Sequence, residues 1–436
     1  MRNDALSRQL RRRHYTHFVL LVICLTTVVG CAVNPVSGIR EVSLLSIADE
    51  IALGESQYGQ VQQMVGGLYE VDDLPAKYVK AVGQRLVVHS DRKLPYEFVV
   101  VNDSTPNAWA LPGGKIGIHR GLLVELENGA ELAAILAHEI VHAAAKHGVN
   151  EIQRELLMEL LSLGVESAVD DSKHERAIVA ASNVGRYLAS RKFDRDEERE
   201  ADYFGIKYLH KAGYDTAAAV SLQEKFVAMN ADRRVSWLGG LFATHPPSEE
   251  RVVNNRAALL EYPPGGDLAQ ASFQVHMRSL FDDREAYDLA DQARESMRTS
   301  TSNALHFIDQ AIDLQPRESL FHGIRGDILA SQGKHSEAVL SYTVAIHRNA
   351  DYFAHYLGRG LSFDALDDSG RARDDFRQSN RLYQTPIASY KLGGFALVEG
   401  DISEAKRHFE IASQDEGEIG KAALRALTQL ALVDES

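Results

Sequence analysis

Two histidines and a glutamate interrupt an apolar, alanine-rich run at residues 132–145. His138 and His142 are four residues apart, so on a helix they lie on one face, one turn apart, and both imidazoles can reach one ion. Glu139 is rotated by about 100° from His138, because a helix has 3.6 residues per turn. It therefore reaches a water molecule on the ion more easily than it shares a coordination position. This H-E-x-x-H pattern predicts a metal-bound water and a carboxylate that deprotonates it.

The residue types at this site favour zinc. Neutral imidazoles bind Zn²⁺ at about 2.0–2.1 Å, and a catalytic site uses three protein ligands and leaves one position to water. Zinc lowers the pKa of that water to about 7, so a neighbouring carboxylate can remove its proton. Two histidines alone are also compatible with a surface pair that binds nothing. The sequence must therefore supply a third ligand, acidic or histidine, on another helix.

A dense acidic segment at residues 194–202 offers that ligand. Glu198 and Asp202 are four residues apart, so they share one face of the helix expected to begin here. The alternative is that the acidic residues only stabilise the N-terminus of this helix through its dipole. That explanation accounts for Asp194 and Asp196.

The order H-E-x-x-H, followed about 55 residues later by E-x-x-x-D, resembles the HtpX-like and CAAX-prenyl-protease-like zinc metallopeptidases, a gluzincin family. The resemblance implies one Zn²⁺ per chain, three protein ligands and one general base. It also implies that Asp202 orients a ligand histidine through the free N–H of its ring. Glu197 or Glu200 replaces the acidic ligand if the register of that segment differs. The implied ligands are His138, His142 and Glu198, and the implied base is Glu139.

Other stretches between residues 45 and 262 resemble the same family, among them "NAWALPGGKIGIHRGLL" and "ATHPPSEERV". Trp109 stands where phenylalanine is commoner. The resemblance implies an edge strand above the metal, which binds a peptide by β-addition with loose selectivity for its sequence. An interior strand that meets no substrate is the alternative. The strand is assigned to Asn107, Ala108, Trp109, Ala110 and Leu111.

Three roles are open for His245. Pro246 follows it, so it lies in a rigid loop or at the start of a helix. It could donate a hydrogen bond in the transition state, approach the zinc as a fourth ligand that excludes water, or pack within the loop. His147 is expected to be structural, because five residues past His142 it points off the metal-binding face. His119 has no assigned role.

The elements that must position these residues are mainly helical. Asn128, with Glu131 three residues later, forms a capping-box pattern, and Gly148 is a typical stop, so a helix is expected over about 129–147. The preceding residues mix helical periodicity with two short β-rich runs, "YEFVVVN" and "KIGIHR", separated by a Pro-Gly-Gly turn. Together with the family resemblance, these patterns predict a mainly α (α+β) gluzincin domain with a small β-sheet.

The remainder of the chain repeats with a period of about 34 residues. Small residues recur where two helices would touch, and an aromatic residue recurs between them, which resembles tetratricopeptide repeats. Four units fit residues 285–418, although the first fits poorly at its start, where Gln292 takes the place of a glycine. An apolar-faced capping helix is expected at 420–432. A non-repetitive helical bundle is the alternative.

The net charge and the N-terminus indicate where the chain works. A net charge of −14 argues against binding to nucleic acid. A basic start and a short apolar run end in Val-Val-Gly-Cys, which resembles a bacterial lipobox and predicts that Cys31 becomes the lipidated first residue. An uncleaved signal anchor is the alternative. Ala32 is not the aspartate that retains enteric lipoproteins at the inner membrane, so an outer-membrane anchor facing the periplasm is expected.

The expected order is a signal peptide at 1–30, a zinc metallopeptidase domain at 31–262, a linker at 263–284, and repeats with a capping helix at 285–436. The chain resembles the periplasmic BepA type of the family, which joins this peptidase to tetratricopeptide repeats. The resemblance implies an endopeptidase for misfolded or unassembled outer-membrane proteins, whose repeats dock clients or the assembly machinery. A lipoprotein scaffold or chaperone with a vestigial or latent peptidase domain is the main alternative. A peptidase acting on peptidoglycan cross-links is a weaker one.

Overall fold

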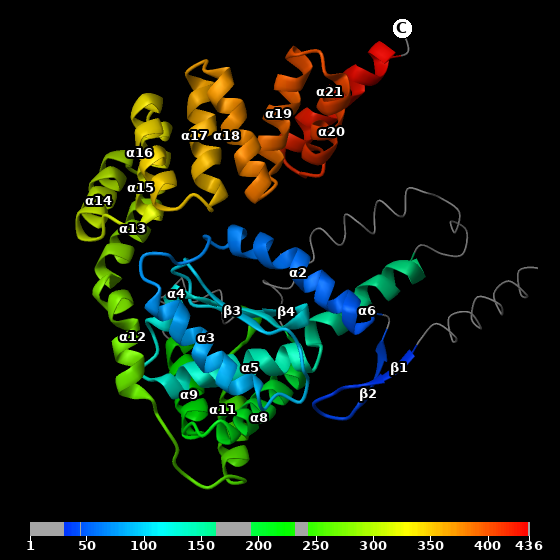
Figure 1. Ribbon diagram of the computed structural model, residues 1–436, viewed down its shortest axis with the longest axis vertical. Helices are drawn as coiled ribbons and strands as arrows, with labels where there is room; N and C mark the ends of the chain where they lie inside the picture. Colours follow the sequence, from blue (N-terminus) through cyan, green and yellow to red (C-terminus); the bar gives the residue numbers. More distant parts are fainter. Residues whose placement is uncertain (1–29, 44, 163–192, 232–242, 435–436) are drawn as a thin grey trace, which may run out of the picture.

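The computed structural model describes residues 30–43, 45–162, 193–231 and 243–434. They form a helical body around a small sheet, followed by a curved solenoid of paired helices (Figure 1). Among these residues, no helix is both long enough and apolar enough to span a bilayer. The predicted signal peptide lies outside the described residues except for Gly30, so its removal and the lipidation of Cys31 stay predictions.

The N-terminal elements frame one side of the body. A two-stranded antiparallel hairpin comes first, and α2 follows with Ser46 as its cap. The side chains of Ser46 and Asp49 each accept a hydrogen bond from the backbone N–H of the other residue. This reciprocal capping box satisfies backbone donors that would otherwise be unpaired at the start of the helix. The helix α3 buries Tyr78 and Leu86 on one face. The bounds are β1 (Gly30–Val33), β2 (Arg40–Ser43), α2 (Ile47–Met64) and α3 (Leu74–Val87).

The central sheet has the strand order β3-β5-β4. The strand β5 pairs in parallel with β3 and antiparallel with β4, so β4 is an edge strand of the described sheet rather than an interior one. Between β4 and β5 the chain turns through Gly113 and Gly114, whose φ angles of 72° and 82° glycine adopts without steric cost. The bounds are β3 (Glu97–Val101), β4 (Ala108–Leu111), η1 (Pro112–Gly114) and β5 (Lys115–His119).

The helix α5 is the buried centre of this body and packs against α3, α8, α9 and the sheet. Asn128 caps it by accepting a hydrogen bond from the backbone of Glu131. The predicted end at Gly148 is wrong. The helix stops at Ala144, Lys146 takes a left-handed φ of 62°, and a new helix contains Gly148. The bounds are α4 (Arg120–Leu123), α5 (Gly129–Ala144), α6 (His147–Ser162), α8 (Arg195–Lys211), α9 (Ala217–Ala231) and α11 (Glu249–Leu259).

The segment at 263–284, expected as a linker, contains the helix α12 (Gln270–Asp282). This helix buries Phe273, Met277 and Leu280 and packs against α3 and α5. The same three side chains belong to one apolar core that continues from the helical body into the first helices of the solenoid. The two parts therefore share their packing at this point.

The solenoid consists of four helix pairs and a final helix, which matches the four predicted units and the capping helix. A Cβ atom added at Gly326 would lie 2.6 Å from the ring of Tyr342, and one added at Gly393 would lie 2.7 Å from that of Phe409. The small and aromatic positions of the repeat therefore touch, as expected. Gln292, in the poorly fitting first unit, is exposed. The bounds are α13 (Arg284–Ser296), α14 (Thr301–Leu314), α15 (Ser319–Ser331), α16 (His335–Arg348), α17 (Phe353–Ala365), α18 (Ser369–Leu382), α19 (Pro386–Val398), α20 (Ile402–Ala412) and α21 (Glu418–Asp434).

Candidate metal centre

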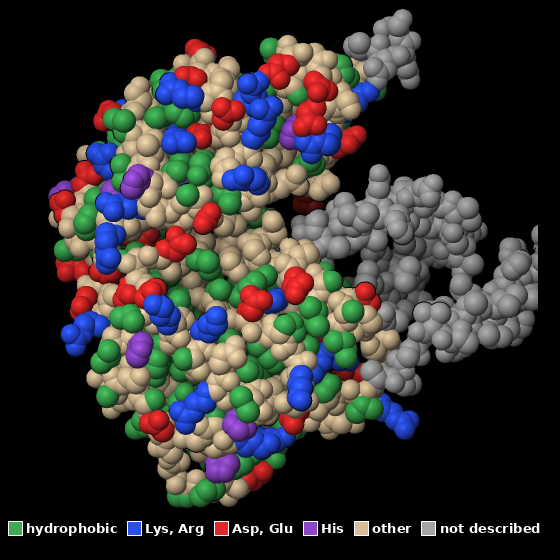
Figure 2. All heavy atoms as spheres, viewed as in Figure 1, with side chains coloured by type: hydrophobic (Ala, Val, Ile, Leu, Met, Phe, Trp, Pro, Cys, Tyr) green, Lys and Arg blue, Asp and Glu red, His purple; other side chains and the backbone are tan. Residues whose placement is uncertain are grey.

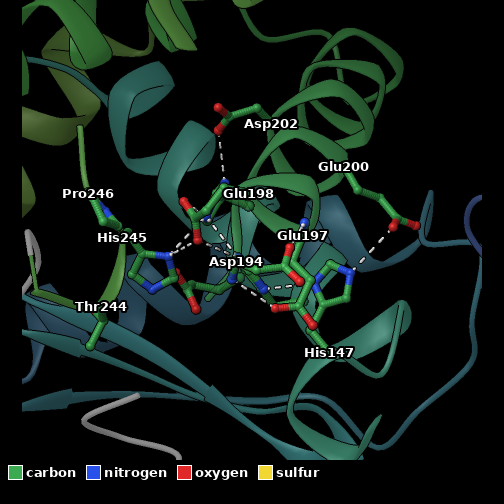
Figure 3. Close-up of polar contacts among 12 residues, drawn as sticks. His147, Asp194, Glu197, Glu198, Glu200, Asp202, Thr244, His245 and Pro246 are labelled. Carbon is green, nitrogen blue, oxygen red and sulfur yellow. Dashed lines mark hydrogen bonds and ion pairs between the residues drawn. The ribbon is translucent and has the colours of Figure 1, made fainter. Parts of the chain in front are cut away.

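Four side chains from three parts of the chain meet at one point. His138 and His142 come from α5, Glu198 comes from α8, and His245 comes from the segment before α11. One potential ligand atom from each lies within 4.8 Å of those of the other three. Figure 3 shows Glu198 and His245 pointing toward each other. The fold thus brings the predicted acidic residue beside both imidazoles of the H-E-x-x-H pattern.

The distances within this cluster suit a cation. His138 Nε2 lies 3.0 Å from His142 Nε2 and 3.2 Å from His245 Nδ1. A neutral imidazole has one donor and one acceptor nitrogen, so three nitrogens this close cannot all be paired with one another. Glu198 Oε1 lies 2.8 Å from His245 Nδ1 and 3.4 Å from His142 Nε2. Imidazole nitrogens and a carboxylate oxygen are the donors that Zn²⁺ takes, so the residues fit the implied metal.

The charges around the cluster also favour a cation. Burial lowers the pKa of His138, but the carboxylates of Glu198 and Asp202 outweigh it and raise that pKa to about 10. Burial lowers the pKa of His142 well below its usual value. Burial would raise the pKa of Glu198, but His245 and Arg251 hold it well below its usual range. The acidic side chains therefore stabilise one positive charge among the ligands, whether it is a proton or a metal ion.

Glu139 lies beside the ligands and is almost wholly buried. Burial raises the pKa of its carboxyl group, which makes it a better proton acceptor than an exposed glutamate. Its Oε1 lies 3.6 Å from His245 Nε2. Its Oε2 has no hydrogen-bond partner in the part of the chain that the structure describes. An ionisable oxygen of this kind, next to a metal site, is suited to accept a proton from water.

Asp202 lies behind His138, where the resemblance placed it. Its Oδ1 is 3.0 Å from His138 Nδ1, the ring nitrogen that faces away from the other ligands. Burial alone would raise the pKa of Asp202, but Arg251 outweighs it, and the pKa lies below its usual value. A carboxylate in this position accepts the Nδ1 proton and leaves Nε2 as the ligand atom.

Arg251, on α11, is a site residue that no pattern in the sequence indicated. It donates to Asp202 from Nε and Nη2, each at 2.7 Å, and its Nη1 lies 2.6 Å from Glu198 Oε2. Its side chain is only 7% exposed. A buried arginine needs carboxylates around it, and the acidic segment of α8 provides two. The only sign in the sequence is a single basic residue that follows two glutamates at the start of a helix.

The other acidic candidates have different partners. Glu197 accepts a hydrogen bond from the backbone of Asp194, and Asp194 in turn caps α8. Glu200 lies 3.4 Å from His147 Nε2, on the outer side of the cluster (Figure 3). The register with Glu198 as the inward-facing residue is therefore the one that the structure adopts.

His147 is not one of the four clustered side chains, but it contacts one of them from behind. Its Nδ1 lies 2.8 Å from Nδ1 of His142, and both side chains are buried. The helical pattern placed His147 off the metal-binding face but did not predict this contact, because it extended α5 beyond its end, whereas the left-handed residue Lys146 turns the chain back toward His142. His119 lies elsewhere, with its Nδ1 3.0 Å from the carbonyl oxygen of Thr105.

The segment before His245 is tied to the start of the edge strand. The backbone N–H of Phe193 donates to the carbonyl oxygen of Thr244, and Thr244 Oγ1 lies 3.4 Å from Asn107 Oδ1. The ring of Phe193 lies 3.9 Å from that of His142. The position of His245 among the ligands is thus fixed by neighbours on both sides.

The strand β4 has a free backbone edge within the described sheet. The backbone N–H of His119 donates to the carbonyl oxygen of Asn107. These two residues continue the β4–β5 register by one residue beyond the pair of Ala108 and Ile118, so they lie opposite each other. Because hydrogen-bonded and non-bonded pairs alternate in an antiparallel ladder, the backbone groups of Ala108 and Ala110 point away from β5. Ala108 N–H is held by the side-chain oxygen of Asn107 at 3.0 Å. Trp109 is buried and contacts Tyr58 edge to face.

A small cavity lies next to Glu139 between α5, α8 and α9. It measures about 50 Å³, and apolar side chains form most of its wall. Gln223 also lines it, and its Oε1 has no hydrogen-bond partner among the described residues. The apolar side chains include Ile135, Ile206, Leu222 and Phe226.

Comparison with known proteins gives one family and several relatives. Residues 73–258 match the model of peptidase family M48. The beta-barrel assembly-enhancing protease of Yersinia pestis is 30% identical over 230 residues, which cover 50% of this chain and 46% of that protein. The mitochondrial metalloendopeptidase OMA1 of Schizosaccharomyces pombe is 30% identical over 220 residues, which cover 50% of this chain and 63% of that protein. The chain thus spans less than two thirds of these curated relatives.

Among solved structures, the crystal structure of MamA is similar to a part of this chain. The matched region covers 36% of this chain and 91% of the MamA chain, with 18% sequence identity and a TM-score of 0.29.

Proposed function

Because its residues 73–258 match the model of peptidase family M48, we propose that the chain is a zinc endopeptidase that cleaves misfolded or unassembled outer-membrane proteins. The observation that most supports this function is the meeting of two imidazoles and a carboxylate from separate helices, with Glu139 beside them. A scaffold has no use for a buried carboxylate in that position.

In the proposed reaction, His138, His142 and Glu198 hold the zinc ion. When bound by these residues, zinc would supply Lewis-acid chemistry, polarising the scissile carbonyl group and lowering the pKa of a water molecule. Glu139 accepts the proton of the attacking water and then delivers it to the leaving amine. Asp202 keeps the proton of His138 on Nδ1, so that Nε2 faces the ligand set.

The edge strand β4 is the proposed binding place for the substrate backbone. Ala110, with its peptide groups directed to the free edge, would pair with an extended peptide by β-addition. The neighbouring cavity would take an apolar side chain next to the cleaved bond. This arrangement supports broad selectivity among unfolded chains, because main-chain groups are common to all of them.

We also infer where the chain acts. The Yersinia pestis relative is a beta-barrel assembly-enhancing protease, which supports envelope proteins as clients or partners. A cleft of about 700 Å³ between α2 and the last helix pairs offers a docking place, lined by Gln60, Met64, Tyr383 and Gln414 among others. On the face that Figure 2 shows, acidic and basic side chains are interspersed. The proposed location is the periplasm, with Cys31 anchored in the outer membrane.

His245 is proposed to hold the site latent. It is buried, and Nδ1 lies close enough to both Glu198 and His138 to occupy the position that water needs. Replacing His245 with alanine should then raise proteolysis. Lost activity would instead favour a transition-state donor, and unchanged activity would favour a role in loop packing.

The proposed function is tested by digestion of casein and of a denatured outer-membrane protein, with and without a chelator. Wild type should cleave both, the chelator should stop cleavage, and zinc should restore it. Glu139→Gln should keep its zinc but lose activity. If Glu139→Gln equals wild type in digestion and in rescue of a deletion strain, the chain is the scaffold or chaperone instead. Metal analysis of wild type and of Glu198→Ala checks the ligand set.

A further inference from the structure

A second line of polar side chains runs outward from the ligand His142. Its Nδ1 contacts Nδ1 of His147 at 2.8 Å, and His147 Nε2 lies 3.4 Å from Oε2 of Glu200. The other carboxylate oxygen of Glu200 accepts a hydrogen bond from Asn34 Nδ2 at 3.1 Å. Asn34 belongs to the N-terminal hairpin, so the line connects that hairpin to the proposed metal site (Figure 3 shows His147 and Glu200).

The protons along this line can be arranged in one way if His142 binds a metal through Nε2. Its other nitrogen, Nδ1, then carries the ring proton and must donate it to His147 Nδ1. His147 accepts at Nδ1, so its own proton lies on Nε2, from where it is directed at Glu200. Glu200 is left as an acceptor for both neighbours. Each group therefore fixes the tautomer of the next.

We propose that His147 and Glu200 are positioning residues for the metal centre, and that Asn34 couples them to the N-terminal hairpin. The proposal rests on the proposed function only in requiring a metal at His142. A ligand imidazole that donates its outer N–H to a fixed acceptor keeps its orientation and tautomer, which strengthens metal binding. Asp202 does this for His138, and this outer line does it for His142.

The hairpin is hydrogen-bonded to α6 as well as to α8. Asn34 also donates to Glu41 Oε1 at 3.0 Å, and Glu41 Oε2 accepts from Asn150 Nδ2 at 3.0 Å. Asn150 lies on α6, whose first residue is His147, whereas Glu200 lies on α8. The hairpin thus bridges the two helices that carry the outer pair. A displacement of the hairpin would change the distance between His147 and Glu200.

The first test is zinc affinity, measured on the full chain by competition with a chromophoric chelator. His147→Phe keeps the ring volume but removes the acceptor, and should weaken zinc binding about 10- to 100-fold. His147→Asn restores an acceptor near the position of Nδ1 and should regain most of the affinity. His119→Phe, at an equally buried histidine without contact to the ligands, should bind zinc like wild type.

Two results of this test would overturn the role of His147. One is wild-type affinity in His147→Phe, and the other is an equal loss in His119→Phe. The ¹⁵N spectrum of the zinc-loaded protein gives an independent readout, because wild-type His142 should carry its proton on Nδ1. A wild-type chain that binds no zinc would instead contradict the proposed function, so the two failures are distinguishable.

The second test concerns the hairpin. The Oδ1 atom of Asn34 accepts from the backbone of Val36 and closes the hairpin turn, whereas its Nδ2 atom serves Glu200 and Glu41. Asn34→Asp keeps the first function and loses the second, and should weaken zinc binding. Arg40→Ala, at an exposed position of the same hairpin, should not. Unchanged affinity in Asn34→Asp would remove the hairpin from the proposal.

Discussion

At the scale of single residues, one guanidinium balances the charge of the site. Arg251 lies between the carboxylates of Glu198 and Asp202, and all three side chains are buried. Burial would lower the pKa of Arg251, but the two carboxylates outweigh it and raise that pKa above its usual value. Removing the arginine would leave two negative charges in a poorly solvated place, which is far more costly than losing an exposed ion pair.

Arg251→Met should therefore lower the free energy of unfolding of the metal-free protein by about 3–5 kcal/mol. Urea titration in the presence of a chelator measures this change. Arg256→Met removes an exposed arginine from the same helix and should change stability by less than about 0.5 kcal/mol. Equal effects of the two substitutions would contradict the charge balance described for Arg251.

The inner residues of the site follow from local helical geometry, whereas the outer ones do not. The i, i+4 spacing alone places His138 and His142 on one face, whereas Glu198 is implied by the family resemblance of the acidic pair that it forms with Asp202. Arg251 and His147 depend on how helices meet and on where α5 stops. A left-handed lysine ends that helix, and lysine carries no sequence signal for such a conformation, whereas Gly148 carries a strong but misleading one.

At the scale of elements, the edge strand depends on a glycine across from its tryptophan. Gly117 of β5 is paired with Trp109 of β4. A Cβ atom added at Gly117 would lie 2.2 Å from Cζ2 of Trp109, far inside contact distance. The indole ring therefore occupies the space of the missing side chain. The unusual tryptophan and this glycine form one packing unit.

Gly117→Ala should push the indole out of place and lower the free energy of unfolding by about 1–3 kcal/mol. Trp109→Phe in the same chain should recover part of that loss, because the smaller ring leaves room for the methyl group. A double-mutant cycle by urea unfolding measures the coupling. Additive effects of the two substitutions would show that the ring and the glycine do not share this space.

The helix α17 contains a buried histidine that makes stability depend on pH. His355 is 1% exposed, and its Nε2 has no hydrogen-bond partner among the described residues. Burial, with a smaller contribution from His322, lowers the pKa of His355 from 6.5 to about 3. The folded chain therefore keeps this ring neutral over a range in which the unfolded chain binds a proton. The contribution of the neutral His355 ring to the free energy of unfolding is complete above the pKa of histidine in the unfolded chain, and it is lost as the pH falls below that value.

Below pH 6.5, the free energy of unfolding should fall by about 1.4 kcal/mol per pH unit from this group, or about 2 kcal/mol by pH 5. His355→Phe should remove that part of the slope. Urea titrations at pH 7.5, 6 and 5 on wild type, on the variant and on His306→Gln, at an exposed position, measure it. The account fails if wild type and His355→Phe lose stability in parallel.

At the scale of the whole molecule, polar contacts join the solenoid to the helical body. The side chain of Gln63, at the end of α2, donates to the carbonyl oxygen of Asp351 at 2.6 Å and accepts from the backbone N–H of Phe353 at 2.9 Å. Earlier in the solenoid, the buried side chain of Glu318 accepts hydrogen bonds from Asn102 of the body and from Tyr287 of α13. These contacts hold the turn before α17 and the start of α15 against the body.

Gln63→Ala should loosen this junction, because the amide of Phe353 loses its acceptor. Hydrogen exchange of that amide should become faster, and the free energy of unfolding should fall by about 1–2 kcal/mol for two lost hydrogen bonds. The neighbouring substitution Gln62→Ala is the matched control. If exchange at the start of α17 is the same in both variants, Gln63 does not hold the solenoid in place.

The architecture of the molecule could be predicted from the repeat period and the metal motif, but its internal boundary could not. The repeat anchors such as Ala338 and Tyr342 are local signals, because each repeats the same helix contact. The run "EYPPGGD" marks a break in helix periodicity and suggested a linker at 263–284. Whether a helix after such a break packs on the body depends on partners far away in the sequence, here on α3.

That packing has a consequence for how the chain can be divided. Since Phe273, Met277 and Leu280 are covered by groups from both halves, truncation at residue 262 would expose an apolar strip on the N-terminal fragment. The detached repeats would carry the complementary strip on their first helices. Neither fragment would therefore be an independent folding unit. A fusion of the repeats to another protein would have to include α12 and a helix that matches α3.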